Sequence, residues 1–408
     1  MMMDGKKLLA AETQFATQQR LPVTHHLTAL QQARLTLPTA DDAFNQIALW
    51  VVAPTLAGFC NWIAAQAAQR PGAQALGVMR EGRVLAELSA TLLQTRPQTV
   101  WLNRKLSMLA AFGAGDDEAL LNWLVRTRLQ PISLYQAWEE LTDVLPPPHL
   151  PDMPLDLTSA QALLQDWQND GLMAMIRQRA SELGQRLLLH WHNIVPPKAN
   201  VPVLLLDFAS VGNIQRSLRT LLTAQGEPDR LIGLNFLTTA GARWAKTKGC
   251  NLRGFLANDG EPAWLADAYA RSPELIEIFT AAPEGSLLDY NATGVPVIGQ
   301  SFLFAEESAA LTHVQAQLPA AVAHYRKILG AALTPDLCRC LWGRLLLAPL
   351  AEEVVALGDW PLDGGLDVTQ QRTVAPLLKT PEPWTKSQTA WPAGSRLRPT
   401  LRNVGGKA

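Results

Sequence analysis

The chain has 408 residues and a formal net charge of −1, with 48% apolar and 17% charged residues. This length allows a large core and two or three domains, and the composition excludes a disordered chain. A charge balance so close to neutral gives no reason to expect nucleic acid as a partner.

Residues 1–45 are polar, predict a helical lead-in and contain no apolar signal core. The cysteines do not follow the spacing of a secreted disulfide framework or of a zinc site; they are Cys60, Cys250, Cys338 and Cys340. We therefore expect a cytoplasmic protein, or one peripheral at the inner membrane. Thirteen tryptophans suit a protein that handles carbohydrate, although we expect most of them to lie in the core.

The stretch Ile47–Ala68 is mostly apolar and approaches the length of a membrane span. Pro54, Gly58 and Asn61 interrupt it. We therefore expect a buried core helix here, with a membrane-embedded enzyme as the alternative.

The first candidate phosphate site follows this helix. Ala75–Met79 predicts a short strand, Arg80, Glu81 and Gly82 a tight loop, and Arg83 the start of an amphipathic helix. A strand that runs through a glycine loop into a helix is a common way to bind phosphate, and the two arginines add positive charge. The alternative is an ordinary α/β turn.

A second cationic position follows in the chain. The apolar run Thr99–Leu102 predicts a strand, which ends at Asn103, Arg104 and Lys105. These cations suit a polyanion, although a solvated strand end has the same composition. The residues from Gly115 to Val195 show helical spacing and predict a helical insertion or cap between strands of one sheet.

The central motif is a buried strand over Val201–Leu206, followed by Asp207 and a small loop, Ala209–Asn213, before a helix. We expect Asp207 at the carboxyl end of the strand, where open α/β sheets bind ligands. The loop and the helix start predict an anion site. Its candidate ligands are Ser210, Gly212, Asn213 and Gln215.

Two further strands are expected over Arg230–Leu237 and Arg253–Leu256, and a helix with a following turn over Ser272–Tyr290. Prolines divide the segment 309–347 into three expected helices, with breaks at Pro319 and Pro335. Several carboxylates in the chain are candidates for accepting a proton, although each also fits a surface position. They are Glu81, Asp259, Glu261 and Glu277.

Two of these motifs together resemble a known family. Ala75–Leu92 is similar to the pyrophosphate loop of type I phosphoribosyltransferases, and Val203–Gln215 resembles their phosphoribosyl-pyrophosphate loop, although Phe208 replaces a second acid. Ile47–Gly299 also resembles the domain that accompanies HAD-type phosphatases in bacterial polysaccharide gene clusters. The motifs in order are Arg80-Glu81-Gly82, Asn103-Arg104-Lys105 and Asp207 to Gln215.

The resemblance implies an α/β protein with a Rossmann-like parallel sheet of phosphoribosyltransferase type and a helical insertion. Residues 46–114 and 196–350 would form this core, residues 115–195 the insertion, and residues 351–408 a C-terminal extension. The implied activity moves ribose 5-phosphate from phosphoribosyl pyrophosphate to a hydroxyl of a glycan, which could be lipid-linked, in O-antigen or capsule synthesis. A separate HAD-type phosphatase would then remove the phosphate and leave ribofuranose.

The candidate residues take the following roles in such a reaction. Asp207 would hold the ribose hydroxyls or, through water, Mg²⁺, and the turn after it would bind the 5-phosphate. The pyrophosphate would be bound by Arg80, Gly82, Arg83, Arg104 and Lys105. Two alternatives stay open: a non-catalytic Rossmann-like binding or scaffold protein, and an HAD-type phosphatase. The latter needs a second Asp at position 209, where the chain has Ala209.

Overall fold

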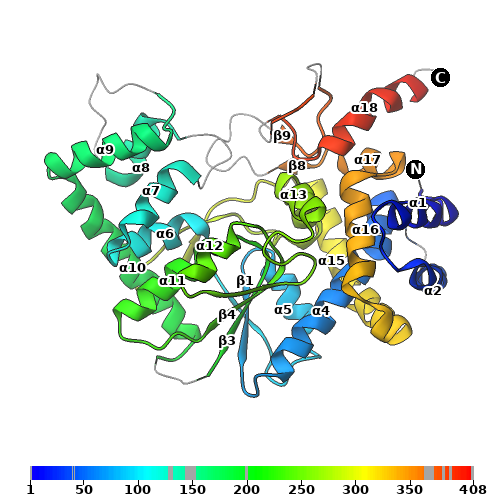
Figure 1. Ribbon diagram of the computed structural model, residues 1–408, viewed down its shortest axis with the longest axis horizontal. Coiled ribbons are helices and arrows are strands. Elements are labelled where there is room, and N and C mark those ends of the chain that lie inside the picture. Colours follow the sequence, from blue (N-terminus) through cyan, green and yellow to red (C-terminus); the bar gives the residue numbers. More distant parts are fainter. Residues whose placement is uncertain are drawn as a thin grey trace.

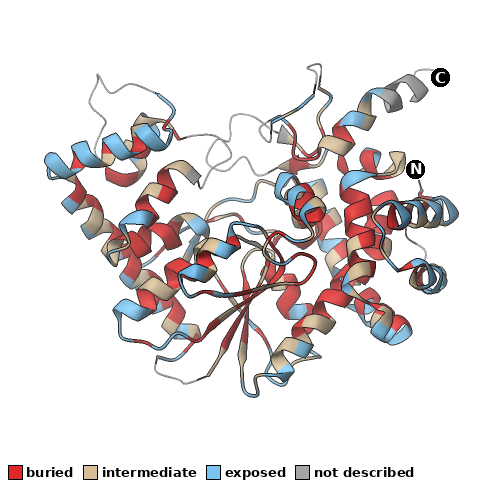
Figure 2. Cartoon of the chain, in the orientation of Figure 1, coloured by how far each residue is buried: buried red, intermediate tan, exposed pale blue. Residues whose placement is uncertain are grey.

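The computed structural model describes residues 2–38, 40, 42–126, 132–142, 153–197, 201–362, 372–378, 382–385 and 388–405. A five-stranded, all-parallel sheet lies at the centre, and helices cover both of its faces (Figure 1). The strands and the inward faces of the helices are buried (Figure 2). The protein therefore has the Rossmann-like α/β architecture expected from the sequence.

The sheet has the strand order β2-β1-β3-β4-β5. Its strands are β1 (Gln74–Val78), β2 (Gln98–Val100), β3 (Val203–Ser210), β4 (Leu231–Thr238) and β5 (Asn251–Gly254). The chain continues from β1 outward to β2 and then returns to β3 on the other side of β1, where Gly77 is in register with Leu206. The strand order therefore reverses between β1 and β3, and this reversal is where doubly wound sheets bind their ligands.

Each of the five strands was predicted within a few residues of its observed position. The main correction concerns β3, which continues to Ser210, so that Asp207 lies inside the strand rather than at its end. The physical reason is that β4 pairs with β3 as far as Ser210↔Thr238 and extends the ladder beyond the apolar run. The observed β5 also begins two residues before the predicted strand.

Strand β3 is apolar at consecutive positions because its alternate residues face two different cores. Leu204 and Leu206 belong to the core on one face of the sheet, and Val203 and Leu205 belong to the core on the other. Because both faces are covered, neither can be polar. In Figure 1, helices α6 (Arg104–Gly113), α10 (Leu172–Ile194) and α11 (Asn213–Ala224) lie on one side of the sheet. The other side carries α4 (Ala53–Ala68), α5 (Gly82–Ser89), α15 (Ala305–Leu329) and α16 (Pro335–Leu347).

The apolar stretch around residue 50 is a core helix. It runs through α3 (Ala43–Ile47), a π-helical turn (Ala48–Val52) and α4, and 78% of its most apolar window is buried within the protein. A Cβ placed on Gly58 would lie 2.5 Å from the Cys338 Sγ atom, which shows how closely α4 approaches α16. The expectation of a buried helix is thus confirmed.

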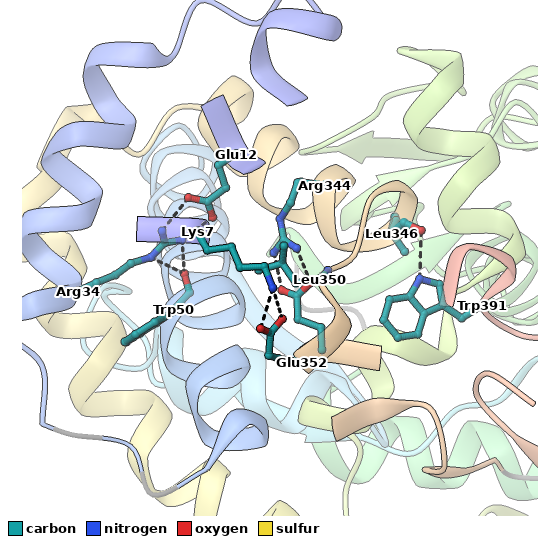
Figure 3. Close-up of polar contacts among 10 residues, drawn as sticks. Lys7, Glu12, Arg34, Trp50, Arg344, Leu346, Leu350, Glu352 and Trp391 are labelled. Atoms are coloured by element: carbon teal, nitrogen blue, oxygen red, sulfur yellow. Dashed lines mark hydrogen bonds and ion pairs between the residues drawn. The ribbon is translucent and has the colours of Figure 1, made fainter. Parts of the chain in front are cut away.

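Two buried ion pairs fix the N-terminal helices α1 (Gly5–Gln18) and α2 (Thr24–Leu35) and the helices after α15. The Arg34 guanidinium donates to both oxygens of Glu12 at 2.6 and 2.7 Å, and also to the Trp50 carbonyl (Figure 3). Arg344 of α16 likewise pairs with Glu353, and all four side chains are at most 1% exposed. Burial of these charges is possible because each has its partner within hydrogen-bonding distance.

Helical prediction was wrong at two places. The predicted helix over Ser272–Tyr290 is the short α14 (Glu274–Thr280) followed by a strand, β6 (Leu287–Tyr290), which pairs with β7 (Pro296–Ile298). Furthermore, α15 passes through Pro319 without ending. The proline removes one backbone hydrogen bond of the helix. The loss of stability is smaller than the gain from burying apolar side chains on both sides of the proline, such as Leu311, Val314, Leu318 and Val322.

The remaining elements extend these layers. They are α7 (Asp117–Arg126), α8 (Leu134–Thr142), α9 (Leu157–Asn169), α12 (Ala242–Thr247), α13 (Ala263–Arg271), a 3₁₀ turn (Gly330–Ala332), α17 (Ala351–Leu357), β8 (Pro361–Leu362), β9 (Arg372–Thr373) and α18 (Pro392–Gly405). The described parts of residues 115–195 are mainly helical, as predicted, and they share one core with α6, α11 and one face of the sheet.

Candidate active site at the carboxyl edge of the sheet

The loops that follow β1, β2 and β3 meet at one edge of the sheet. Since the three strands are parallel neighbours, their carboxyl ends point the same way. This places Glu81 after β1, Arg104 after β2 and Asp207, one residue beyond the last pair of β1 with β3, at a common edge. The first loop and the third adjoin the point where the strand order reverses.

Two glycines let the first loop approach β3. A Cβ on Gly82 would lie 2.7 Å from the Gly77 carbonyl carbon and 2.9 Å from the Leu206 carbonyl oxygen, and a Cβ on Gly77 would lie 2.0 Å from the Gly82 oxygen. No side chain fits at these distances, so glycine is required at both positions. The Met79–Arg80 peptide bond within this loop is cis. The close contact of Gly82 with Gly77 and Leu206 holds Glu81 beside β3.

The carboxyl group of Asp207 is the most perturbed acid at this edge. Burial and, to a smaller extent, the Glu81 carboxylate raise the pKa of Asp207, the Phe208 N–H and the Arg104 guanidinium lower it, and the net result is a pKa of about 7. The Phe208 N–H donates to the Asp207 carboxylate at 2.7 Å. A buried carboxyl with a pKa near neutrality is a feature of sites that transfer protons.

Side chains from the second half of the chain complete this edge. The Arg80 guanidinium lies 5.4 Å from the centre of the Phe302 ring and 3.7 Å from the Glu81 carboxylate. Tyr269 of α13 is buried, and its pKa is raised well above the usual value by burial and then by Glu277, Asp207 and Glu81. The field of Glu277 therefore acts on the same buried residue as the fields of Asp207 and Glu81.

A pocket adjoins the first loop. It is lined in part by Glu274, Glu277, Ile278, Phe302, Leu303 and Trp360, and it has about 300 Å³ of empty space, counting the part open to solvent. Because Phe302 both lines this pocket and contacts Arg80, the pocket opens next to the carboxyl edge. Phe302, Trp360 and Tyr269 were not among the predicted site residues, because no local motif marks them: Phe302 and Trp360 lie in loops after β7 and α17, and Tyr269 lies within α13.

Two of the predicted cations point to other partners. Lys105 pairs with Glu140 of α8 and lies 5.8 Å from the Trp123 ring, and its assignment to the pyrophosphate stays a prediction. Arg83 donates to the Gln315 amide oxygen at 2.8 Å, which ties the start of α5 to α15. Arg104 is the exposed first residue of α6, and it is the cation of its motif that acts on Asp207.

The turn after β3 leads into a helix, as predicted. Gly212 has a φ of +90° and precedes Asn213, the first residue of α11, so the helix begins directly after Ser210 and the turn. Gln215 is used within the fold, and its role in binding a phosphate stays a prediction. Its buried amide nitrogen donates to the carbonyls of Leu231 and Asn251, both at 3.1 Å, and is thereby used to join α11 to β4 and β5.

The four predicted bases fall into two pairs. Glu81 acts on Asp207, and Glu277 acts on Tyr269, the buried residue on which Asp207 and Glu81 also act. Asp259 instead pairs with Lys246 at 2.6 Å beyond β5, and Glu261 is exposed beside Arg243. Both of these acids thus lie beside cations of the region around α12, and their role as bases stays a prediction.

The carboxylates at this edge suit a Mg²⁺ ion that is shared with a substrate, rather than a metal site built from protein ligands alone. Among the described residues, no group of three or more His, Cys, Asp or Glu could hold a metal ion. Asp207 and Glu81 nevertheless place two repelling carboxylates together. Mg²⁺ commonly binds through one or two carboxylates together with the phosphates of a substrate, and this donor set fits that mode.

Comparisons with known proteins add no family assignment. No protein-family model matches the sequence, and the search of curated proteins found no match.

Proposed function

We propose that the protein is a phosphoribosyltransferase that moves ribose 5-phosphate from phosphoribosyl pyrophosphate to a hydroxyl of a glycan and releases pyrophosphate. The observation that carries this proposal is the meeting of the three loops at the reversal of the strand order, where Glu81, Arg104 and Asp207 interact. A donor with a sugar between two phosphate groups needs anion-binding loops on both sides of a group that holds its hydroxyls.

In the proposed complex, the loop after β1 and the start of α6 bind the pyrophosphate. The Arg80 and Arg104 guanidiniums supply positive charge, and the glycine at position 82 lets this loop pack directly against β1 and β3. At the other end of the donor, the turn through Gly212 and the N-terminus of the twelve-residue α11 take the 5-phosphate. Asp207, between them, holds the ribose hydroxyls.

The reaction balances without a redox partner. The bond between ribose C1 and pyrophosphate breaks, and its electron pair leaves with the pyrophosphate oxygen. The acceptor oxygen then bonds to C1, and its proton passes to a carboxylate. Glu81 and Glu277 are the two predicted bases near this edge, and Asp207 with its pKa of about 7 is a third.

Mg²⁺, held by Asp207 and Glu81 together with the donor phosphates, would neutralise charge on the leaving pyrophosphate. The protein's own residues must then orient the pentose and stabilise its cation-like transition state. The carboxylates of Asp207 and Glu81 can do so through their charge, because they lie in a partly buried site where charge is screened less than in water.

The sequence of β3 does not fit an HAD-type phosphatase. An HAD-type nucleophile needs a second Asp two residues later, and β3 has Ala209 there. The product would therefore keep its 5-phosphate, and we propose that a separate HAD-type phosphatase removes it. Since the most apolar helix is buried, a lipid-linked acceptor would be reached from the membrane surface rather than from within the bilayer.

Mass spectrometry can test the proposal. The protein is incubated with phosphoribosyl pyrophosphate, Mg²⁺ and a panel of glycan acceptors, and the products are searched for the mass gain of one ribose phosphate. Asp207→Ala should abolish this gain while the variant keeps its circular dichroism spectrum. Calorimetry with the donor alone separates the alternatives. Binding without turnover indicates a scaffold, and no binding rejects the proposal.

A further inference from the structure

An open groove lies beside β5, the strand that ends the sheet next to β4. Its volume of about 460 Å³ falls within the range for sites that bind small molecules. Polar and charged residues form much of its wall, and it is lined in part by Lys246, Asn251, Leu252, Arg253 and Asn258. This edge of the sheet therefore offers room for a polar ligand.

Arg253 brings a positive charge to the groove. Its Nη1 atom donates to the side-chain oxygen of Gln66 in α4 at 2.7 Å, and Arg70 Nη1 donates to the carbonyl of the same Gln66 at 2.6 Å. Within the described residues, neither arginine forms an ion pair with an acid. Burial and then the charge of Arg253 lower the pKa of Arg70. Two neighbouring guanidiniums without an acidic partner attract an anion.

The other polar groups of the groove suit hydroxyls better than a second charge. The Lys246 ammonium is held by both oxygens of Asp259, at 2.6 and 2.8 Å, and is therefore neutralised. Asn251 is exposed, and its side chain makes no hydrogen bond to the rest of the described chain. A carboxamide can donate to one hydroxyl and accept from another. No aromatic ring is among the described residues that line the groove, so a nucleotide base would have no ring to stack on.

Packed side chains separate the groove from the turn after β3. A Cβ on Gly212 would lie 2.5 Å from the Ala245 Cβ atom and 2.6 Å from the Leu252 Cδ1 atom. Both of these side chains are buried, and Leu252 also lines the groove. Because β4 lies between β3 and β5, these two strands are about 10 Å apart. A ligand in the groove would thus have contacts different from those of the donor.

We propose that the groove beside β5 is a second ligand site and that it binds a phosphorylated sugar. Arg253 binds the phosphate through the N–H groups that Gln66 does not use, and the charge of Arg70 adds to the attraction. The Asn251 amide binds hydroxyls of the sugar. This inference does not rest on the proposed function, because none of these residues is assigned to the donor.

Calorimetry on the full chain at constant ionic strength tests the inference. The probes are glucose 6-phosphate, mannose 1-phosphate and N-acetylglucosamine 1-phosphate, with glucose and inorganic phosphate as the matched controls. We expect at least one sugar phosphate to bind about tenfold more tightly than either control, because only the sugar phosphate meets both the guanidinium and the amide. If no sugar phosphate binds, the inference is wrong.

Substitutions locate the bound molecule. Arg253→Gln should weaken its binding about tenfold, whereas Arg104→Gln, which removes a cation of the donor edge, should change it by less than about twofold. If Arg253→Gln does not fold, Arg70→Gln replaces it and should weaken binding about threefold. The reverse pattern, with a loss only in Arg104→Gln, would place the sugar phosphate at the donor edge and overturn the inference.

Asn251→Ala tests the contact with the sugar. It should lower the affinity for the sugar phosphate about fivefold and leave the affinity for inorganic phosphate unchanged, because the amide contacts hydroxyls only. Equal affinities of the unchanged protein for inorganic phosphate and for every sugar phosphate would show that the groove holds a phosphate ion alone, which contradicts the inference.

The outcomes also separate this inference from the transferase proposal. Arg253→Gln should leave transfer from phosphoribosyl pyrophosphate intact, because Arg253 lies outside the donor edge. If sugar phosphates bind through Arg253 and the donor does not bind to the unchanged protein, the groove site is real and the transferase proposal fails. If the donor binds and no sugar phosphate of the panel does, the transferase proposal stands and the groove site is rejected.

Discussion

The Glu81 carboxylate, in the loop after β1, acts on Asp207 of the adjacent strand β3, and together with burial it raises the pKa of Asp207 to about 7. Two acids that are far apart in the sequence thus form one electrostatic unit at the point where the strand order reverses. Two carboxylates held close together destabilise the fold when both are ionised, and such pairs are found at sites that bind a cation or a substrate.

Asp207→Asn should stabilise the protein at alkaline pH and leave its stability unchanged near pH 4. In the folded chain the Asp207 carboxyl stays protonated up to about pH 7, whereas in the unfolded chain it ionises near its usual value of about 4. The folded state therefore binds more protons between these values, and the stability of the unchanged protein falls as the pH rises through this window.

Urea unfolding between pH 4 and pH 8 measures this effect, and we expect a gain on the order of 4 kcal/mol at pH 8, since each of the three units of pKa difference corresponds to about 1.4 kcal/mol. Glu81→Gln provides the matched comparison. Removal of the Glu81 charge should lower the pKa of Asp207 in the folded chain, so that stability stops falling at a lower pH than in the unchanged protein. Part of the pH dependence should remain, because burial is the larger cause of the raised pKa. A gain from Asp207→Asn that does not depend on pH would contradict the assignment.

Arg104→Ala should weaken binding of phosphoribosyl pyrophosphate by about tenfold, whereas Lys105→Ala should change it by less than about twofold. The sequence alone treats these neighbours alike. In the structure Arg104 acts on Asp207, and Lys105 pairs with Glu140 of the helical region. Calorimetric titration of both variants with the donor decides the matter, and equal losses would show that the two side chains share one site.

Gly82→Ala should cost about 1–3 kcal/mol and abolish donor binding, because its Cβ would collide with the backbone of Gly77 and with the Leu206 carbonyl. Gly226→Ala is the control. It also replaces a glycine, at a φ of +70° with no atom within 4 Å of the new Cβ, in the loop before β4. It should cost about 1 kcal/mol through backbone strain and leave donor binding intact. Thermal unfolding and calorimetry measure both properties.

Arg344→Met should destabilise the protein by about 3–5 kcal/mol, because it leaves the fully buried Glu353 carboxylate without its counter-charge. Combination with Glu353→Gln should recover most of this loss, since an amide can still accept the hydrogen bond from the Leu350 N–H. The Lys7–Glu352 pair is close by in Figure 3 but is partly exposed, so Lys7→Met should cost less than about 1 kcal/mol. Equal costs in urea unfolding for Arg344→Met and Lys7→Met would show that burial does not decide the strength of these pairs.

The local pattern of apolar residues was sufficient to predict the strands of the sheet. The unbroken apolar runs at β1, β3 and β4 predict strands buried on both faces, and a parallel sheet places the loops that follow them at one edge. The glycine loop after β1 was therefore predicted together with its neighbour Asp207. Prediction failed where long-range pairing changes an element, as in the extension of β3 to Ser210 and the continuation of α15 through Pro319.

By itself, the sequence determined the α/β class, the strands and the residues that follow each strand, because burial on both faces leaves a local mark. Only the tertiary structure decided which of those residues share a site. Lys105 and Gln215 are directed to other partners by contacts with Glu140 and with the backbone of β4 and β5, and Phe302 reaches Arg80 through a loop after β7. The physical reason is that a side chain's direction and partner depend on how distant segments pack, and neighbours in the sequence carry no record of that packing.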